Sequence, residues 1–111
     1  MNDLIQRIVN AQIRMEGASA TATNPLNLRA APWLTDPVIE HGFWKPATRA
    51  EGLAGGAHQV ALNIARGYSL AKHIAAFAPA SDGNNTLLYI ENVANWANIP
   101  DPTVPLWTYI D

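Results

Sequence analysis

Apolar residues recur at helical spacing in several separate stretches, which predicts a mainly helical chain. The first stretch runs from Asp3 to about Met15, with Asn2 or Asp3 as its cap. Gly17 follows as the expected terminator. The apolar positions of this stretch are Leu4, Ile5, Ile8, Val9 and Ile13. We therefore expect an amphipathic first helix with Glu16 at its C-terminal end.

A second helix is expected to begin at Thr48–Glu51, which fits the capping-box pattern, and to end at Gly67. Its expected buried stripe consists of Leu53, Ala57, Val60, Ala61 and Ile64. Three glycines inside this helix, at positions 52, 55 and 56, each weaken it by up to about 1 kcal/mol relative to Ala. We expect another backbone or a ligand to approach the helix closely at these positions; the alternative is that the helix simply tolerates the glycines.

Two shorter helices follow. Ser69 is the expected cap of a helix over Leu70–Phe77, which Pro79 stops. Asn85 is the expected cap of a last helix over Thr86–Ala97. The residues of this last helix expected to face inward are Leu87, Ile90, Val93 and Ala94.

The segments outside these helices are rich in proline. Residues 17–47 read as a long ordered loop with a short turn or hairpin near Leu28–Phe43, and loops of this length are often functional. The tail from Pro100 to Pro105 is expected to be extended, with Leu106 and Trp107 pinning it to the body. We thus expect one domain over residues 1–111, mainly α, with one long loop between the first and second helices.

Composition narrows the functional classes. The chain has 111 residues, 49% hydrophobic and 14% charged, which is typical of one small globular domain and not of a disordered segment. The net charge of −2 and the scattered aromatic residues argue against nucleic-acid binding. The absence of cysteine excludes disulfides and thiolate metal sites.

Targeting and metal-binding patterns are also missing. No apolar run approaches about 18 residues, so no membrane span is expected. The stretch Met1–Arg7 lacks the pattern of a signal peptide, so delivery outside the cytoplasm would need another route. His41, His58 and His73 do not have metal-ligand spacing, and no phosphate loop or nucleophile elbow is present. We expect neither a metal nor a cofactor.

Glu16 is the strongest candidate for chemistry. An acid at the C-terminal end of a helix lies where the macrodipole is negative, which disfavours the carboxylate form. A carboxylic acid that keeps its proton near neutral pH can protonate a leaving group. Glu16 is therefore a candidate general acid, and the alternative is a surface carboxylate at a frayed helix end.

The pair Glu16-Gly17, followed by Asn-Pro-Leu-Asn-Leu-Arg over Asn24–Arg29, resembles the start of small phage-type lysozyme-like proteins. These are lytic transglycosylase or muramidase domains of phages and prophages. The similarity continues over most of the chain, at Phe43, Gly55–Ile64, Gly67–Leu70, Phe77–Pro79, Asn84–Thr86, Tyr89 and Ile99–Pro102. One departure is Leu26, where the family pattern usually has Gly, so the loop geometry is expected to differ.

The resemblance implies a helical lysozyme-like fold with a cleft for a peptidoglycan glycan strand. It places the catalytic acid at Glu16 and the substrate bond at the β-1,4 link between N-acetylmuramic acid and N-acetylglucosamine. Asn24 and Asn27 could bind N-acetyl groups, or instead hold the loop together. Tyr89 could contact a sugar or the acid, or be a core tyrosine. Arg29 could pair with Glu16 or position the loop.

The number of carboxylates bears on the mechanism. Hydrolysis with two carboxylates needs a second one roughly 5–9.5 Å from the first. The candidates are Asp36, Glu40, Glu51 and Asp82, and none stands out. In a lytic transglycosylase the substrate's own 6-hydroxyl attacks, and one residue acts first as acid and then as base. The sequence therefore favours a transglycosylase over a hydrolase.

Two other classes of function stay open. One is a non-catalytic virion structural or glycan-binding protein on the same scaffold, which the Leu26 departure favours. The other is a small inhibitor or regulatory protein that binds a partner through Pro100–Trp107. For the enzyme, we expect a phage-encoded protein that acts in the periplasm or is carried in the virion, with other particle proteins as further partners.

Overall fold

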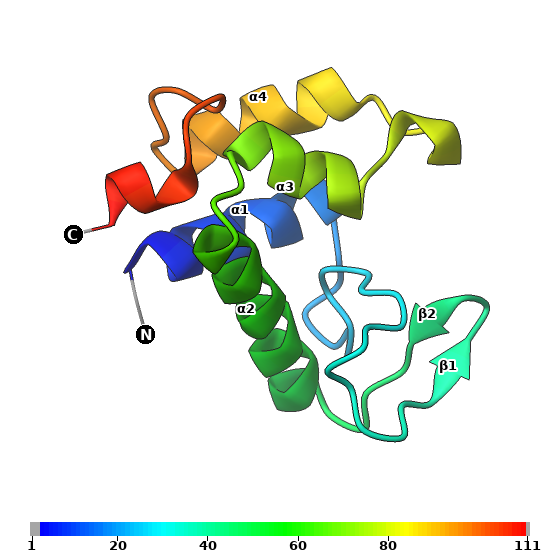
Figure 1. Ribbon diagram of the computed structural model, residues 1–111. Coiled ribbons are helices and arrows are strands. Elements are labelled where there is room, and N and C mark those ends of the chain that lie inside the picture. Colours follow the sequence, from blue (N-terminus) through cyan, green and yellow to red (C-terminus); the bar gives the residue numbers. More distant parts are fainter. Residues whose placement is uncertain (1–2, 111) are drawn as a thin grey trace.

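A computed structural model describes residues 3–110 of the chain (Figure 1). Its elements, in order, are α1 (Asp3–Glu16), β1 (Ile39–Glu40), β2 (Phe43–Trp44), α2 (Arg49–Ala65), α3 (Leu70–Phe77) and α4 (Thr86–Trp96). Two short 3-10 segments are also present, at Ala80–Asp82 and Leu106–Tyr109. The expectation of a mainly α chain is confirmed.

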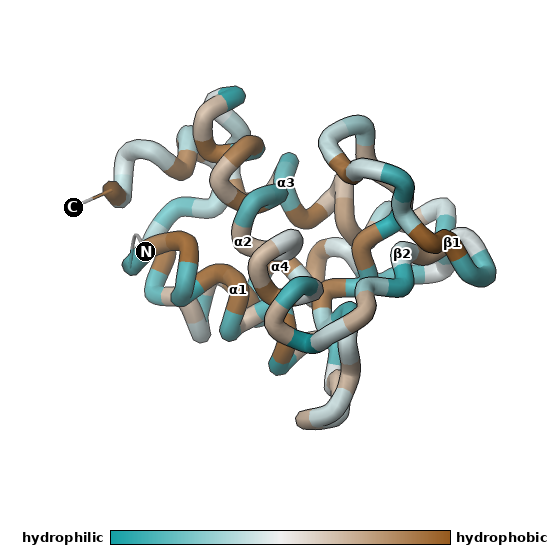
Figure 2. Tube along the Cα trace, turned by 90° about the horizontal axis from the view of Figure 1, so that it is seen from below, coloured by the Kyte–Doolittle hydropathy of each residue, from teal (hydrophilic) through white to brown (hydrophobic). Residues whose placement is uncertain are grey.

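The core lies where the helices meet. α1 packs against both α2 and α4, and α3 packs against α4 (Figure 1). The fully buried apolar residues of these helices include Leu4, Ile8, Val60, Leu70, Ile74 and Val93. In Figure 2 hydrophobic and hydrophilic segments alternate along α1, as expected for a helix with one face on a core.

The helix boundaries follow the expected caps. The Thr48 hydroxyl accepts the Glu51 amide at 3.1 Å, and the Ser69 hydroxyl accepts the Lys72 amide at 3.1 Å. Gly17 ends α1 with a φ of +65°, and its amide donates to the Ile13 carbonyl at 3.1 Å. The proposed cap at Asn2 lies outside the described residues, whereas Asp3 is the first residue of the helix.

Two predictions about buried faces were wrong in part. On α4, Val93 is buried as expected, but Leu87 is 75% exposed and Tyr89 is buried instead. On α2, Val60 and Ile64 are buried as expected, whereas Leu53 is only half-buried and the three glycines are buried. In both helices, the face that is buried depends on the segments that pack against the helix and not on apolar periodicity alone.

The α2 glycines are sites of close approach, as expected. A Cβ at Gly52 would overlap the carbonyl of Thr23, and one at Gly55 would overlap the ring of Trp44. At Gly56 it would lie 3.0 Å from a methyl of Leu26. The absence of side chains on this face of α2 therefore allows the loop 17–47 to lie directly on the helix.

The loop 17–47 is ordered and contains the expected hairpin. β1 and β2 pair antiparallel around His41 and Gly42, which both have positive φ (53° and 83°), as a type I′ turn requires. An isolated bridge pairs Arg29 with Phe43, which adds a third stretch of backbone beside β2. Val38 and Ile39 are exposed on the outer edge of this hairpin, where β1 carries a hydrophobic stretch in Figure 2.

The tail is held to the body, but it is not extended throughout. Leu106 is completely buried, and its amide donates to the Tyr68 carbonyl at 2.9 Å. Trp107 packs over Gly67 yet remains 54% exposed. After Pro105 the chain turns into the 3-10 segment Leu106–Tyr109. Among residues 3–110, no helix is long and apolar enough to cross a membrane.

Candidate functional site

Glu16 is the last residue of α1, where the helix meets the loop 17–47. Its side chain is half-buried. Each carboxylate oxygen accepts one side-chain hydrogen bond. Oε2 accepts from Nδ2 of Asn27 at 2.9 Å, and Oε1 accepts from the Tyr89 hydroxyl at 3.0 Å. Asn27 and Tyr89, which lie 11 and 73 positions from Glu16 in the sequence, therefore converge on this acid.

Asn27 reaches Glu16 because the loop turns sharply at this residue. Its φ is +52°, a conformation that Asn tolerates better than most residues, and its amide donates to the Asn24 carbonyl at 3.0 Å. Leu26 has an ordinary φ and is 1% exposed. The residue with left-handed backbone conformation is thus Asn27 and not Leu26, whose side chain packs towards Gly56 of α2.

Tyr89 joins the core to the acid. It is 4% exposed, yet its hydroxyl donates to Glu16. Burial first, and then the neighbouring Glu16 carboxylate, raise the pKa of the Tyr89 hydroxyl, against a smaller opposing influence of Gln12. Tyr89 therefore keeps its proton and acts as a hydrogen-bond donor to Glu16. Its two expected roles, core residue and contact to the acid, are both present.

Asn24 holds the loop together. Its Nδ2 donates to the carbonyls of Leu28 and Trp44, at 3.0 and 2.8 Å, and its Oδ1 accepts the Leu28 amide at 3.0 Å. Both ends of the side chain are thereby committed to backbone groups. Of the predicted substrate-binding residues, Asn27 and Tyr89 meet at Glu16, whereas Asn24 supports the segment that carries Asn27.

Arg29 does not pair with Glu16. Its guanidinium forms an ion pair with Asp82 at 3.0 Å and lies over the ring of Phe43, 4.6 Å from the centroid. The ion pair joins the loop to the 3-10 segment that precedes α4. Among the described residues, Glu16 is in no ion pair.

The other candidate carboxylates have structural partners or lie apart from Glu16. Asp82 pairs with Arg29, and Glu40 pairs with Lys45 at 2.9 Å. Glu51 accepts the Ala47 amide at 3.2 Å and belongs to the α2 cap. Asp36 is an exposed turn residue with a φ of +43°. None of the four shares a hydrogen bond with Glu16 in the described part of the chain.

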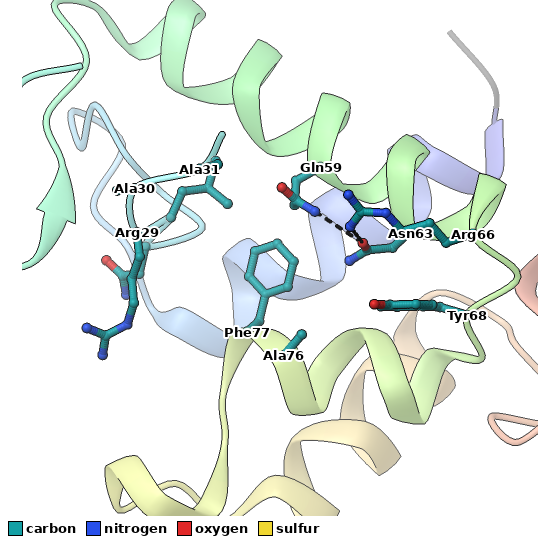
Figure 3. Close-up of a pocket in the computed structure, with 11 residues that line it drawn as sticks. Arg29, Ala30, Ala31, Gln59, Asn63, Arg66, Tyr68, Ala76 and Phe77 are labelled. Atoms are coloured by element: carbon teal, nitrogen blue, oxygen red, sulfur yellow. Dashed lines mark hydrogen bonds between the residues drawn. The ribbon is translucent and has the colours of Figure 1, made fainter. Parts of the chain in front are cut away.

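A cavity of about 180 Å³ opens beside this cluster, between the loop, α2 and α3 (Figure 3). Asn27, which binds Glu16, is one of its lining residues. In Figure 3 the ring of Phe77 lies between Arg29 on one side and the group of Gln59, Asn63 and Arg66 on the other. The described residues that line the cavity include no carboxylate side chain, so Glu16 is not among them.

The three histidines lie apart, and residues 3–110 contain no group of side chains suited to a metal ion. His41 is in the hairpin turn, and His58 meets Trp33 edge to face, with the ring centroids 4.5 Å apart. His73 is completely buried, and burial lowers its pKa to about 3.

Two polar residues near the site were not expected. Gln12 and Asn63 are fully buried and hydrogen-bond the His73 ring. A signal for both exists in the sequence. Gln12 follows Ile8 by four positions and Asn63 follows Val60 by three, so each continues a buried apolar stripe.

Comparison with known proteins identifies no relative, since no family model, no curated protein and no solved structure matches this chain.

Proposed function

We propose that the protein cleaves peptidoglycan at the β-1,4 bond between N-acetylmuramic acid and N-acetylglucosamine, with Glu16 as general acid. The observation that carries this proposal is the setting of Glu16, a half-buried carboxylate held at both oxygens by Asn27 and Tyr89, of which Asn27 also lines a cavity. The resemblance of Glu16-Gly17 and Asn24–Arg29 to phage lysozyme-like domains gives the substrate class.

The described ion pairs place no cation against Glu16. A cation paired with the carboxylate would hold it ionised and oppose transfer of a proton to the leaving oxygen. Arg29, which the sequence offered as a partner, is engaged by Asp82 instead, and Arg14 lies over the ring of Trp96. The two groups bound to Glu16 are neutral, and one of them, Asn27, is exposed and can be displaced by a ligand.

A lytic transglycosylase is favoured over a hydrolase because Glu16 has no second carboxylate near it among its described contacts. In this mechanism Glu16 gives its proton to the glycosidic oxygen as the bond to the anomeric carbon breaks. The 6-hydroxyl of the same muramic acid residue then attacks the anomeric carbon, and its proton passes to Glu16. The acid is thereby restored, and the product carries a 1,6-anhydro ring.

The expected setting follows from the substrate. A phage-encoded enzyme of this kind acts in the periplasm or from within the virion, where its partners are the glycan strand and other particle proteins. The described contacts require no cofactor for the chemistry, since one acid and the substrate's own hydroxyl complete the proton balance.

Muropeptide analysis of Glu16→Gln against wild type tests the proposal. Loss of the general acid should lower cleavage by about 10²–10⁴-fold, because glutamine cannot give up a proton. Glu91→Gln is the matched control, since Glu91 is an exposed glutamate on α4 and loses the same charge. Equal cleavage by wild type and Glu16→Gln would refute the role of Glu16. Reducing ends without 1,6-anhydro products would select hydrolysis.

A second candidate is a non-catalytic virion structural or glycan-binding protein. The cavity that Asn27 lines, of about 180 Å³, favours the structural form of this candidate, because it is smaller than the roughly 300–1,000 Å³ of most small-ligand pockets. It could hold one substituent of a sugar but not a length of glycan strand. Sedimentation with insoluble peptidoglycan separates the two, since this candidate requires equal binding by wild type and Glu16→Gln, with cleavage by neither.

A further inference from the structure

The cavity of about 180 Å³ between the loop 17–47, α2 and α3 combines hydrogen-bond donors with apolar walls. Its polar lining residues on α2 and just after it are Gln59, Asn63, Arg66 and Tyr68. Figure 3 shows the first three of these side chains gathered at one wall. The apolar lining includes the ring of Phe77 and the methyl groups of Ala30, Ala31 and Ala76.

Arg66 brings a positive charge to this cavity that the described residues do not neutralise. Nη1 of Arg66 donates to Oδ1 of Asn63 at 3.2 Å, and the other N–H groups of the guanidinium remain available as donors. Arg66 belongs to none of the described ion pairs, whereas Arg29, also in the lining, is paired with Asp82 at 3.0 Å. Arg66 is therefore the cation that a ligand in the cavity would meet.

Tyr68 and Lys72 strengthen the positive character of this wall. Within residues 3–110 the Tyr68 hydroxyl has no hydrogen-bond partner, and Figure 3 shows its oxygen end pointing towards Phe77. Nζ of Lys72 lies 4.5 Å from the centroid of the Tyr68 ring, and Lys72, like Arg66, is in no described ion pair. The field at this wall thus favours an anion, although the chain has a net charge of −2.

The size and the walls of the cavity indicate the kind of anion. A guanidinium can bind a carboxylate through two parallel hydrogen bonds, and a tyrosine hydroxyl can donate another. The cavity of about 180 Å³ holds several times the roughly 30 Å³ that one water occupies, which is enough for a carboxylate with a few carbon atoms. Phe77 and Ala76 offer apolar contact to those carbons, which a hydrated inorganic anion would not use.

We propose that this cavity binds a small organic carboxylate, held by Arg66 and the Tyr68 hydroxyl, with its carbon atoms against Phe77. Two sources share this chemistry: a free short-chain acid and the carboxylate end of a peptide stem of peptidoglycan. The second source rests on the proposed function, whereas the carboxylate site itself does not. Asn27 lines the cavity and binds Glu16, so a stem bound here would contact a residue that also holds the acid.

The first test uses two probes that differ only in the carboxylate, N-acetyl-D-alanine and N-acetyl-D-alaninamide. Titrated into ¹⁵N-labelled protein, the acid should shift the backbone amide signals of Arg66, Tyr68 and Ala76, with a Kd in the millimolar range. The amide should bind about tenfold more weakly or less, because it lacks the charge. Equal binding of both, or no saturable shift with the acid up to about 50 mM, would overturn the proposal.

Two glutamates introduced side by side on α3 form a matched pair of variants. Ala75 and Ala76 are both exposed, but only Ala76 lines the cavity. Ala76→Glu should weaken binding of N-acetyl-D-alanine by about tenfold or more, because it sets a like charge beside the ligand. Ala75→Glu changes the net charge equally and should bind as wild type does. Unchanged binding in Ala76→Glu, or equal losses in both variants, would refute a site in this cavity.

The two donors are tested by Arg66→Gln and Tyr68→Phe. Arg66→Gln should weaken binding of the acid by about tenfold or more, and Tyr68→Phe by a smaller factor, because a charged donor contributes more than a neutral one. Arg14→Gln is the matched control, since Arg14 is also an exposed arginine but lies over the ring of Trp96. Equal affinity in Arg66→Gln and Arg14→Gln would contradict the role of Arg66.

Sedimentation with insoluble peptidoglycan distinguishes the two sources of the carboxylate. Wall with its natural carboxylates is compared with wall whose carboxylates have been converted to amides. If the stem is the ligand, the conversion should lower binding of wild type by about tenfold, and Ala76→Glu should bind both walls alike. Equal binding of wild type to both walls, with binding of N-acetyl-D-alanine retained, would assign the site to a free acid. If the wild type does not cleave peptidoglycan, the proposed function fails, and the titration with N-acetyl-D-alanine still decides whether the carboxylate site exists.

Discussion

The loop 17–47 and the helical body are held by different kinds of interaction. The helical body has a continuous apolar core, in which residues such as Ile8 and Ile74 are fully buried. The loop has few such residues and is tied instead by side chains that bind backbone, chiefly Asn24 and Arg49. Glu16 lies at their junction, with Asn27 from the loop on one oxygen and Tyr89 from the body on the other.

This difference shows how the two partners of Glu16 can be altered separately. Burial makes Tyr89 part of the stability of the domain, whereas exposed Asn27 can change with little effect on the core. Substitutions in the body should therefore change mainly the free energy of unfolding, and substitutions in the loop should change mainly the geometry at Glu16.

The largest effect on stability is expected from the core. Ile74→Ala should lower the free energy of unfolding by about 2–5 kcal/mol, because it removes a completely buried side chain and leaves a cavity. Leu87→Ala, at a position 75% exposed, should change it by less than about 0.5 kcal/mol. Urea denaturation measures both. A large loss at Leu87 would mean that α4 buries the face that the apolar pattern first indicated.

The buried His73 should make stability depend on pH. Its pKa is about 3 in the folded chain and about 6.5 when unfolded, so between these values only the unfolded state binds the proton. The free energy of unfolding is highest above pH 6.5 and should fall by up to about 1.4 kcal/mol per pH unit as the pH drops towards 3.

Denaturation at several pH values checks this dependence. His73→Gln should remove this part of the slope, whereas His41→Gln, at a side chain 90% exposed, should keep it. The same slope in wild type and His73→Gln would contradict the neutral, buried state of His73.

The contact between loop and body is tested at the α2 glycines. Gly52→Ala should destabilise the protein by about 1–3 kcal/mol, because the new Cβ meets the backbone carbonyl of Thr23, which cannot move without shifting the loop. Gly56→Ala meets the side chain of Leu26, with its two methyls at 3.0 and 3.3 Å, and should cost less than Gly52→Ala because a side chain can shift by a few tenths of an ångström more easily than backbone can. Thermal unfolding of the two variants gives the comparison, and equal effects would argue against close backbone contact at Gly52.

Smaller effects than at Gly52 are expected within the loop. Asn24→Ala should cost about 1–2 kcal/mol, since it removes three hydrogen bonds to the backbone. Asn27→Gly keeps the positive φ and should change the free energy of unfolding by about 0.5 kcal/mol or less, while it removes one bond to Glu16. Denaturation measures both, and a larger loss at Asn27 would show that the loop depends on its contact with the acid.

Much of the secondary structure could be predicted because its signals are local. Thr48, Ser69 and Asn85 each accept a backbone amide at the start of a helix, and Gly17 and Gly67 end helices with positive φ. The buried faces were harder, since whether Leu87 or Tyr89 points inward depends on what packs against α4 and not on the helix itself.

The candidate site could also be predicted only in part. Glu16, Asn27 and Tyr89 were expected near a common site, but Asn24 and Asn27, three residues apart in one motif, could not be told apart in the sequence. A positive φ at Asn27 turns one side chain to Glu16, and the nearby backbone of Leu28 and Trp44 takes the other. Gln12, Asn63 and His73 form their hydrogen bonds only because three helices bring them together.

The sequence by itself determined the helices, their caps, the long loop and the acid at the end of the first helix, because each depends on residues within a few positions of one another. Only the tertiary structure decided what surrounds that acid. Asn27 and Tyr89 come from distant parts of the sequence, and their bonds depend on packing that no local pattern contains. For that reason Glu16 could be singled out early, whereas its two partners could be assigned only from the folded chain.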